Sequence, residues 1–324
     1  MNHRERIEAC LEGNPADRVP VALWRHFPVD DQDPTRLAQA TLNFQNTFDF
    51  DLVKVTPASS FCLRDWGVQD VWKGATEGTR EYVNRVIKEP DDWARLPVLN
   101  PTRGYLADQL ESLKIITSEL GDSVPVIQTI FNPLTQAKNL SGQQKLISHM
   151  RKYPQAVHAG LKIIAESTRR FIEALQQSDI AGVFYAVQHA QHGMLTPQEY
   201  REFGRAYDLE LLEATKRYWL NMLHLHGEDI MFETLADYPV QIMNWHDLDT
   251  EPSLNEGLKQ FQGAVCGGLR REQTMVLGTP EQVKAEANQA IQITSGKRFI
   301  LGTGCVVPIT APFGNLKAAR ESVE

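Results

Sequence analysis

The sequence predicts an α/β protein whose 324 residues form one domain, a (β/α)8 TIM barrel. Eight short apolar runs rich in β-branched residues have the character of strands, and segments with helical spacing lie between them. Strands that alternate with helices form a parallel sheet, and eight such units close into a barrel. No low-complexity tract or glycine-rich linker interrupts the chain, so we expect a single domain over residues 1–324.

The expected strands are distributed along the whole chain. They comprise residues 19–23, 51–55, 124–130, 181–186, 221–226, 240–245, 263–268 and 298–304. Residues 82–89 also have an extended pattern, but they are polar at alternate positions and follow the turn-rich stretch "VQDVWKGATEG". We therefore expect a β-hairpin inserted after the second strand. The charged N-terminal stretch predicts a short helix that ends at Gly13.

Helical segments between the strands are marked by spacing and by capping signals. Val157, Leu161 and Ile164 begin an apolar stripe with helical periodicity. The sequences "TPQE" at 196–199 and "TPEQ" at 279–282 are capping boxes with proline at the first helical position. An open, doubly wound sheet is the main alternative. It is disfavoured because "VALWRHFP", after the first strand, has no glycine-rich phosphate-binding turn.

Composition narrows the class of protein. A net charge of −8 argues against nucleic acid or an anionic membrane as the main partner. No apolar run reaches the roughly 18 residues that a membrane span needs, and the N-terminus does not resemble a signal peptide. The four cysteines are irregularly spaced, which favours a cytoplasmic chain with free thiols.

A barrel of this kind carries its active site at the carboxyl ends of the strands. Six of the nine histidines follow expected strands, whereas the other three lie on expected helices and should be solvated. The strand ends therefore form the candidate functional face.

The stretch "LNMLHLHGED" supplies the most specific group of candidate metal ligands. His224 and His226 are two residues apart, so in a strand both rings point the same way. With Cys305 at the end of the last strand they form a candidate zinc site, and three protein ligands would leave a fourth position open for catalysis. The alternative is a pair of histidines that simply make hydrogen bonds at a strand end. Cys266 is another possible ligand, although a small core residue fits it better.

Other polar residues at the strand ends are candidates for proton transfer and substrate binding. The catalytic candidates are His189, His192, His246 and Asp247, because imidazole titrates near neutral pH and a carboxylate can fix its tautomer. The substrate-binding candidates are Arg25, His26, Gln128, Asn132, Trp245 and Arg270. The two arginines could hold a carboxylate, and tryptophan could form a wall. Hydrogen-bonded loop anchors, exposed arginines and buried packing are the alternatives.

Several blocks together resemble the uroporphyrinogen decarboxylase superfamily, which also contains zinc-dependent methyltransferases that pass a methyl group from a corrinoid to a thiol. The similar segments are "PADRVPVALW", "PVIQTIFNPLTQAKNLSG", "GMLTPQEYREFGRAYDLELLEATK", "HLHG", "GTPEQVKAEA" and "GTGCVVPITAPFGNLKAA". The resemblance covers nearly the whole chain and implies the same eight-stranded barrel. It also suggests a homodimer.

Departures from the decarboxylase pattern favour the methyltransferases. Decarboxylases carry an "RQAGRY"-type segment after strand one, where this chain reads "WRHFPVD", and a carboxylate after strand two, where it reads "VKVTPASS". They have histidine where Cys305 stands. His224 and Cys305 match the zinc ligands of the methyltransferases, while His226 replaces a cysteine. The second imidazole would leave bound zinc more positive and a stronger Lewis acid.

The sequence therefore favours a zinc-dependent, methyltransferase-like enzyme that activates a thiol or a similar nucleophile. The chain lacks the D-x-H-x-x-G signature of a corrinoid-carrying domain, so a corrinoid would have to come from a separate protein. The first alternative is a decarboxylase of uroporphyrinogen or another polycarboxylate. A metal-dependent hydrolase and a non-catalytic binder of corrinoid or tetrapyrrole rank lower.

Overall fold

Eight parallel strands form a nearly closed barrel in the computed structural model, which describes residues 1–324. The strands, in their order around the sheet, are β1 (Val21–Ala22), β10 (Phe299–Thr303), β9 (Ala264–Leu269), β8 (Ile242–Trp245), β7 (Met222–Leu225), β6 (Gly182–Val187), β5 (Val126–Phe131) and β2 (Val53–Val55). β1 and β2 stand at the two ends of this order, and the N–H of Asp51 donates to the carbonyl of Val21 at 2.8 Å between them. The predicted fold class and all eight predicted strands are confirmed.

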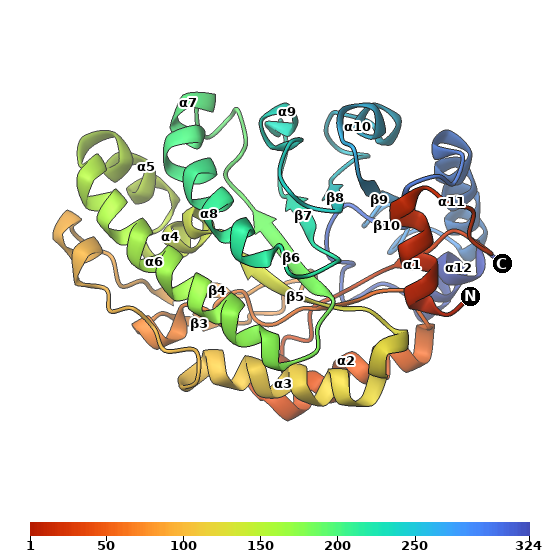
Figure 1. Ribbon diagram of the computed structural model, residues 1–324, viewed down its shortest axis with the longest axis horizontal. Helices are drawn as coiled ribbons and strands as arrows, with labels where there is room; N and C mark the ends of the chain where they lie inside the picture. The colour runs from red at the N-terminus through yellow and green to blue at the C-terminus, as the bar shows by residue number, and fades with distance from the viewer.

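Helices surround the strands, as Figure 1 shows. In chain order they are α1 (His3–Glu12), α2 (Pro34–Phe48), α3 (Gly104–Leu120), α4 (Pro133–Ser141), α5 (Gln143–Lys152), α6 (Pro154–Ala174), α7 (Pro197–Tyr200), α8 (Ala206–Thr215), α9 (Phe232–Leu235), α10 (Leu254–Gln260), α11 (Pro280–Thr294) and α12 (Phe313–Glu321). The capping boxes predicted at Thr196 and Thr279 begin α7 and α11. None of these helices is long and apolar enough to cross a membrane.

Buried Asp51 anchors the N-terminal segment to the barrel. Its carboxylate accepts hydrogen bonds from the guanidinium groups of Arg6 and Arg18, both at 2.6 Å, and from the N–H of Val21 at 2.8 Å. Burial opposes ionisation, but the bonds from His3, Arg18 and Val21 outweigh it and lower the pKa of Asp51 to about 2. The predicted helix ends at Gly13, in the left-handed conformation that glycine favours.

The predicted hairpin is also confirmed, as β3 (Gln69–Val71) paired antiparallel with β4 (Glu81–Asn84). Its turn reaches the loop after β10, because the N–H of Ile309 donates to the carbonyl of Thr76 at 2.7 Å. At Gly78, φ is +79°, and a Cβ atom there would lie 2.4 Å from Cβ of His26. Only glycine therefore lets the turn approach the end of β1 so closely.

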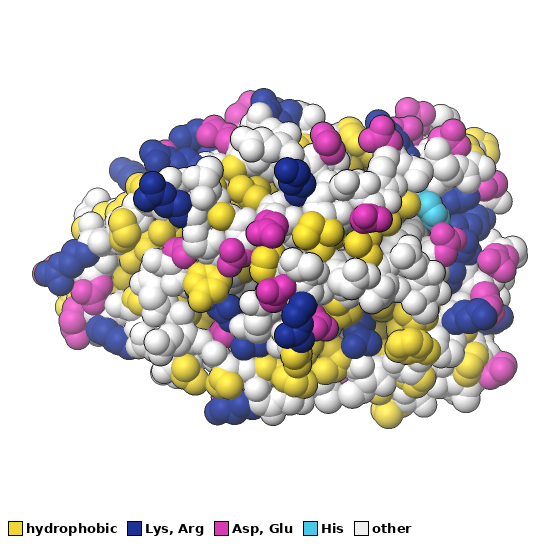
Figure 2. Space-filling view, turned by 90° about the horizontal axis from the view of Figure 1, so that it is seen from below, with side chains coloured by type: hydrophobic (Ala, Val, Ile, Leu, Met, Phe, Trp, Pro, Cys, Tyr) yellow, Lys and Arg dark blue, Asp and Glu magenta, His cyan; other side chains and the backbone are white.

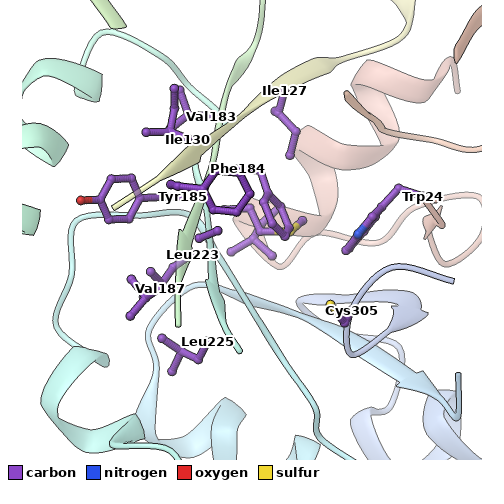
Figure 3. Close-up of a cluster of buried hydrophobic side chains, with 14 of the residues drawn as sticks. Trp24, Ile127, Ile130, Val183, Phe184, Tyr185, Val187, Leu223, Leu225 and Cys305 are labelled. Atoms are coloured by element: carbon purple, nitrogen blue, oxygen red, sulfur yellow. The ribbon is translucent and has the colours of Figure 1, made fainter. Parts of the chain in front are cut away.

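Side chains of the strands alternate between the barrel interior and the surrounding helices. Figure 3 shows Trp24, Phe184 and Cys305 toward one side of β6, and Tyr185 and Leu225 toward the other. The outward side holds a fully buried carboxylate, Asp208, which accepts hydrogen bonds from the hydroxyls of Tyr185, Tyr200 and Tyr238 and from the amide of Asn132. This network joins β6 to α8 and to the segments after β5 and β7.

The molecular surface carries charges of both signs. Figure 2 shows lysine, arginine, aspartate and glutamate side chains interspersed on the face seen from below, with no extended patch of one sign.

Candidate metal centre and adjoining cavity

Four side chains at the carboxyl ends of three strands meet at the mouth of the barrel. They are His224, His226, His246 and Cys305, and their possible ligand atoms all lie within 4.8 Å of one another. Nδ1 of His226 is 3.7 Å from Sγ of Cys305 and 3.4 Å from Nε2 of His246. The structure thus brings together the three residues proposed from sequence as metal ligands, from β7 and from the loop after β10.

The ring of His224 is held by a buried amide. Its Nδ1 lies 2.7 Å from Oδ1 of Asn244, and Nδ2 of Asn244 donates to the carbonyls of Cys266 and Thr303. Because those two bonds fix which end of the amide is the acceptor, Nδ1 of His224 carries the proton and Nε2 is free to act as a ligand. Phe184 stacks on the same ring with centroids 5.2 Å apart.

The cluster favours a thiolate. Burial by itself raises the pKa of Cys305, but the three neighbouring imidazoles outweigh burial and hold that pKa well below its usual range. Burial lowers the pKa of His224. Nitrogen and sulfur donors without a carboxylate are the ligand set that Zn²⁺ accepts in proteins, so the residues present fit this ion.

His246 lies inside the cluster rather than apart from it. Its side chain is 11% exposed, and its Nδ1 is 3.8 Å from Oδ2 of Asp249. The carboxylate that sequence reasoning assigned to orient a histidine, Asp247, accepts instead from the N–H of Gly268 at 3.0 Å. Burial raises the pKa of Asp247 to about 7. Asp247 could have fixed the tautomer of His246 or His189 if they met in space, but it forms no hydrogen bond with either ring, and Asp249 is the carboxylate near His246.

A cavity with an empty volume of about 590 Å³ adjoins the cluster inside the barrel mouth. Aromatic side chains, polar side chains and the cluster itself line it, and they include Trp24, His26, Lys54, Thr56, Glu77, Phe131, Phe184, His224, His226 and Cys305. Aromatic side chains combined with a few polar groups are a lining typical of a small-molecule site. Of the predicted substrate-binding residues, His26 lines this cavity.

The other five predicted substrate-binding residues do not line the cavity. Arg25 lies over the ring of Phe27 on the α2 side of the sheet. Gln128 points outward and accepts from Gln109 of α3 at 2.9 Å. Asn132 caps α4 and binds Asp208. All three belong to the contacts between barrel and helices, because side chains on a strand alternate and these positions face outward.

Trp245 and Arg270 are likewise structural. Nε1 of Trp245 donates to the carbonyl of Pro252 at 2.8 Å, and its ring packs against Phe232. Arg270 forms an exposed ion pair with Glu286 of α11. Trp245 is a buried packing residue and Arg270 is a surface arginine, as in the alternative interpretations of the sequence.

The two histidines after β6 differ from each other. His189 is buried, neither ring nitrogen has a hydrogen-bond partner, and burial lowers its pKa to about 3, so its ring is neutral. His192 is exposed and lines a different hollow with Asp229 and Glu251. Neither residue belongs to the four-residue cluster.

His149, which we expected to be solvated, is buried and accepts from Nε1 of Trp93 at 3.0 Å. Cys266 is a fully buried core residue, as its environment in the sequence suggested.

Sequence reasoning missed two charged residues that line the cavity, Lys54 and Glu77, and the arginine that pairs with Glu77. Lys54 projects from β2 into the barrel and is 7% exposed. Glu77, in the turn of the hairpin, pairs with Arg271, which also donates to the carbonyl of Val306. The signal for Lys54 was present in the sequence, because a lysine in the middle of the apolar run "DLVKV" needs a reason to be buried.

Comparison with known proteins places this architecture in a family. The family model described as "Uroporphyrinogen decarboxylase (URO-D)" matches residues 2–324. The methylcobamide:CoM methyltransferase MtaA of Methanosarcina barkeri is 21% identical over 333 residues, which cover 97% of this chain and 95% of that protein. A uroporphyrinogen decarboxylase of Anaeromyxobacter dehalogenans is 24% identical over 354 residues and covers 100% of this chain and 98% of its own length.

A solved structure agrees with the sequence comparisons. A methyltransferase from Methanosarcina mazei superposes with a TM-score of 0.87 at 19% identity, over 99% of this chain and 98% of the other. At such identities the relatives show the fold and the family, and they include both methyltransferases and decarboxylases. The chain is therefore a divergent member of the uroporphyrinogen decarboxylase family.

Proposed function

We propose that this protein is a zinc-dependent enzyme that transfers a methyl group to a small thiol. The single observation that carries the proposal is the convergence of His224, His226, His246 and Cys305 within 4.8 Å at the mouth of the barrel. A zinc ion held there would act as a Lewis acid that favours the thiolate form of a bound thiol. The similarity to methylcobamide:CoM methyltransferases over almost the whole chain supports the same reaction class.

The protein's own residues prepare the site for a thiol. His224 is fixed in one tautomer by Asn244, and the imidazoles keep Cys305 ionised. His246 is the side chain placed to accept the thiol proton, because the carboxylate of Asp249, 3.8 Å from its Nδ1, would stabilise the imidazolium. Trp24, Phe131 and Phe184 line the adjoining cavity with aromatic surface.

The methyl donor would come from outside the chain. The proposed reaction forms a carbon–sulfur bond and breaks the bond between the methyl carbon and its carrier, with the electron pair left on the carrier. In the relatives named methylcobamide:CoM methyltransferase, that carrier is a methylcobamide. We infer a separate corrinoid protein as the partner here. A homodimer and a cytoplasmic location stay predictions.

Decarboxylation is the second candidate. It is favoured by Lys54, a buried lysine at the cavity whose protonated form could bind a carboxylate, and by the similarity to uroporphyrinogen decarboxylases. In that case the cationic groups would stabilise negative charge that develops at carbon, without a metal.

One pair of assays distinguishes these functions. Zinc-loaded protein is supplied with methylcobalamin and a small thiol, and chelated protein is supplied with uroporphyrinogen. The proposal predicts thioether formation that requires zinc and is lost in Cys305→Ala, whereas His192→Ala, outside the cluster, keeps the activity. Decarboxylation by chelated protein, without zinc-dependent thioether formation, would contradict it.

A further inference from the structure

A separate pocket lies between the loops after β1 and β2 and the beginnings of α2 and α3. Pro57 is the one residue that lines both this α2–α3 pocket and the cavity at the barrel mouth, so the loop after β2 separates the two spaces. None of the four residues of the candidate metal cluster lines the α2–α3 pocket. A ligand bound there would therefore be distinct from the substrate of the cluster.

Two buried side chains that line the α2–α3 pocket carry hydrogen-bond acceptors for which the protein supplies no donor. The side chain of Asp31 is 0% exposed, and its Oδ2 has no hydrogen-bond partner. Gln109 is 4% exposed, and its Nε2 donates to Oε1 of Gln128 at 2.9 Å. Nε2 of Gln128 in turn donates to the carbonyl of Thr129, which fixes both amides and leaves Oε1 of Gln109 as the end without a partner. Buried acceptors without donors are costly, so both atoms call for a ligand that carries N–H groups.

The two guanidinium groups beside the pocket share a carboxylate that does not line it. Nη2 of Arg64 donates to Oδ1 of Asp70 at 2.9 Å, and Nε of Arg80 donates to the same oxygen at 2.8 Å. Nη1 of Arg80 is also 3.6 Å from Oδ1 of Asp31, on the side away from the unpartnered Oδ2. The two positive charges therefore balance Asp70 and Asp31 and leave no cation for the other carboxylates of the pocket.

Asp33 and Asp108 carry the excess negative charge. Both line the α2–α3 pocket, and neither forms an ion pair. Burial, followed by the carboxylates of Glu111, Asp65 and Asp33, raises the pKa of Asp108 above its usual range. Burial likewise raises the pKa of Asp31. Both shifts have the sign expected of carboxylates that lack a nearby positive charge, which a bound cation would supply.

We propose that the α2–α3 pocket binds the ammonium group of a small primary amine. Oδ2 of Asp31, Oε1 of Gln109 and the carboxylate of Asp108 supply acceptors for the three N–H donors of such a group. Pro57 and Phe61 give an apolar wall for its carbon chain. The proposed site lies beyond the proposed methyl transfer and does not depend on it.

A bare divalent metal ion fits the pocket less well than an ammonium ion does. Such a metal ion needs several oxygen ligands that converge on one point. Asp31, Asp33 and Asp108 do not form a group whose ligand atoms all lie within 4.8 Å of one another, as the residues of the cluster at the barrel mouth do. An ammonium group needs only separate acceptors on different sides, and an alkyl chain uses the apolar wall.

Ligand-observed NMR titration tests the site with n-butylamine, which is an ammonium ion at pH 7, and with 1-butanol as its neutral isostere. Chelated protein is used, so that no metal at the barrel mouth binds the amine. We expect n-butylammonium to bind at least about 10-fold more tightly than 1-butanol, because it gains charge-assisted hydrogen bonds. Equal binding of the two compounds, or binding of neither, would overturn the inference.

Variants connect the amine to the pocket. Asp31→Asn removes the charge but keeps the size of the side chain, and it should weaken n-butylammonium binding by about 10-fold while leaving 1-butanol unchanged. Asp108→Asn, at an exposed position of α3, should weaken it by about 3-fold. Asp122→Asn, beyond the other end of α3, is the matched control and should bind as wild type does.

Circular dichroism checks the folding of each variant, and Asp108→Asn decides if Asp31→Asn does not fold. A preference for the amine that is undiminished in the folded variants would show that the amine binds elsewhere.

Two further arms fix the class of ligand and keep the α2–α3 pocket distinct from the metal centre. Mg²⁺ and Ca²⁺ at the same concentration as the amine should not displace it, and displacement by either ion would make the pocket a metal site instead. Cys305→Ala, which breaks the cluster, should bind n-butylammonium as wild type does. Loss of amine binding in that variant would place the amine at the barrel mouth and overturn the inference, whatever the outcome of the methyl-transfer assay.

Discussion

Asn244 Oδ1 lies 2.7 Å from Nδ1 of His224 and so determines which nitrogen of that ring faces the cluster. The amide is itself fixed by two carbonyls, those of Cys266 and Thr303, on the adjacent strands β9 and β10. Three strands therefore cooperate to orient one ring. Partners of this kind keep a ligand in position and commonly change metal affinity when they are removed.

Replacement of Asn244 by Ala should weaken zinc binding by about 10- to 100-fold, because His224 loses the group that fixes its tautomer. Competition with a chromophoric chelator measures the change. Gln241→Ala, on the segment before β8, removes a hydrogen bond to Asn221 away from the cluster and is the control. Equal affinity of wild type and Asn244→Ala would show that the amide has no part in metal binding.

The fold could be predicted from local sequence patterns. Each strand is an apolar run bounded by turn residues, and each run forms one strand of the parallel sheet. Convergence of His224, His226 and Cys305 could also be anticipated, since the carboxyl ends of the strands share one face. The directions in which the side chains of Gln128 and Trp245 point could not be anticipated from the sequence. A shift of one residue along a strand moves a side chain from the barrel interior to the exterior. The ends of strands expected from sequence are uncertain by more than one residue.

His246 was a candidate for proton transfer in the sequence, and the structure adds that it lies beside the proposed metal ligands. The sequence offered Asp247 as a carboxylate that could orient His246 or His189 if they met in space, but successive residues at a strand end point to different sides. Asp247 turns to the N–H of Gly268, and the ring of His246 turns to His226. A charged residue that lines the cavity from a distant segment, such as Glu77 in its pair with Arg271, carries no local signal in the sequence.

His246→Ala should alter the pH dependence of methyl transfer more than it alters folding. If His246 accepts the thiol proton, the variant should lose rate by about 100-fold near neutral pH and recover part of it at alkaline pH, where the thiol ionises unaided. The pH profile of kcat/KM measures this. Asp249→Asn should give a smaller loss in the same direction. An unchanged pH profile in both variants would exclude the proton-transfer role.

Lys54 should make stability depend on pH. Burial lowers its pKa from 10.5 to about 7, so the folded state binds this proton less tightly than the unfolded state does. Its contribution to stability is therefore present above pH 10.5 and is lost as the pH falls toward 7. Lys54→Met should be more stable than wild type at pH 7, by roughly a few kcal/mol, and the difference should shrink toward pH 10.

Urea denaturation of both proteins at the two pH values gives the free energies of unfolding. A difference that is constant between pH 7 and pH 10 would mean that Lys54 keeps an ordinary pKa in the folded protein.

Asp208 should matter for stability alone. Four hydrogen bonds end on its buried carboxylate, so Asp208→Ala leaves three tyrosine hydroxyls and the amide of Asn132 without their acceptor. We expect a loss of about 3–5 kcal/mol in the free energy of unfolding. Asp237→Ala, which removes a more exposed carboxylate paired with Arg205, should cost about 1 kcal/mol or less. Similar losses in the two variants would contradict the importance of the buried network.

The most direct test of the whole account is the metal content of the purified protein combined with X-ray absorption at the zinc edge. The account predicts about one zinc per chain, with one sulfur neighbour at about 2.3 Å and the remaining ligands nitrogen or oxygen. Cys305→Ser should remove the sulfur signal, and His224→Ala should lower the zinc content. Protein that takes up no zinc, or zinc whose surroundings are the same in both variants as in wild type, would contradict the claim that these residues form a metal centre.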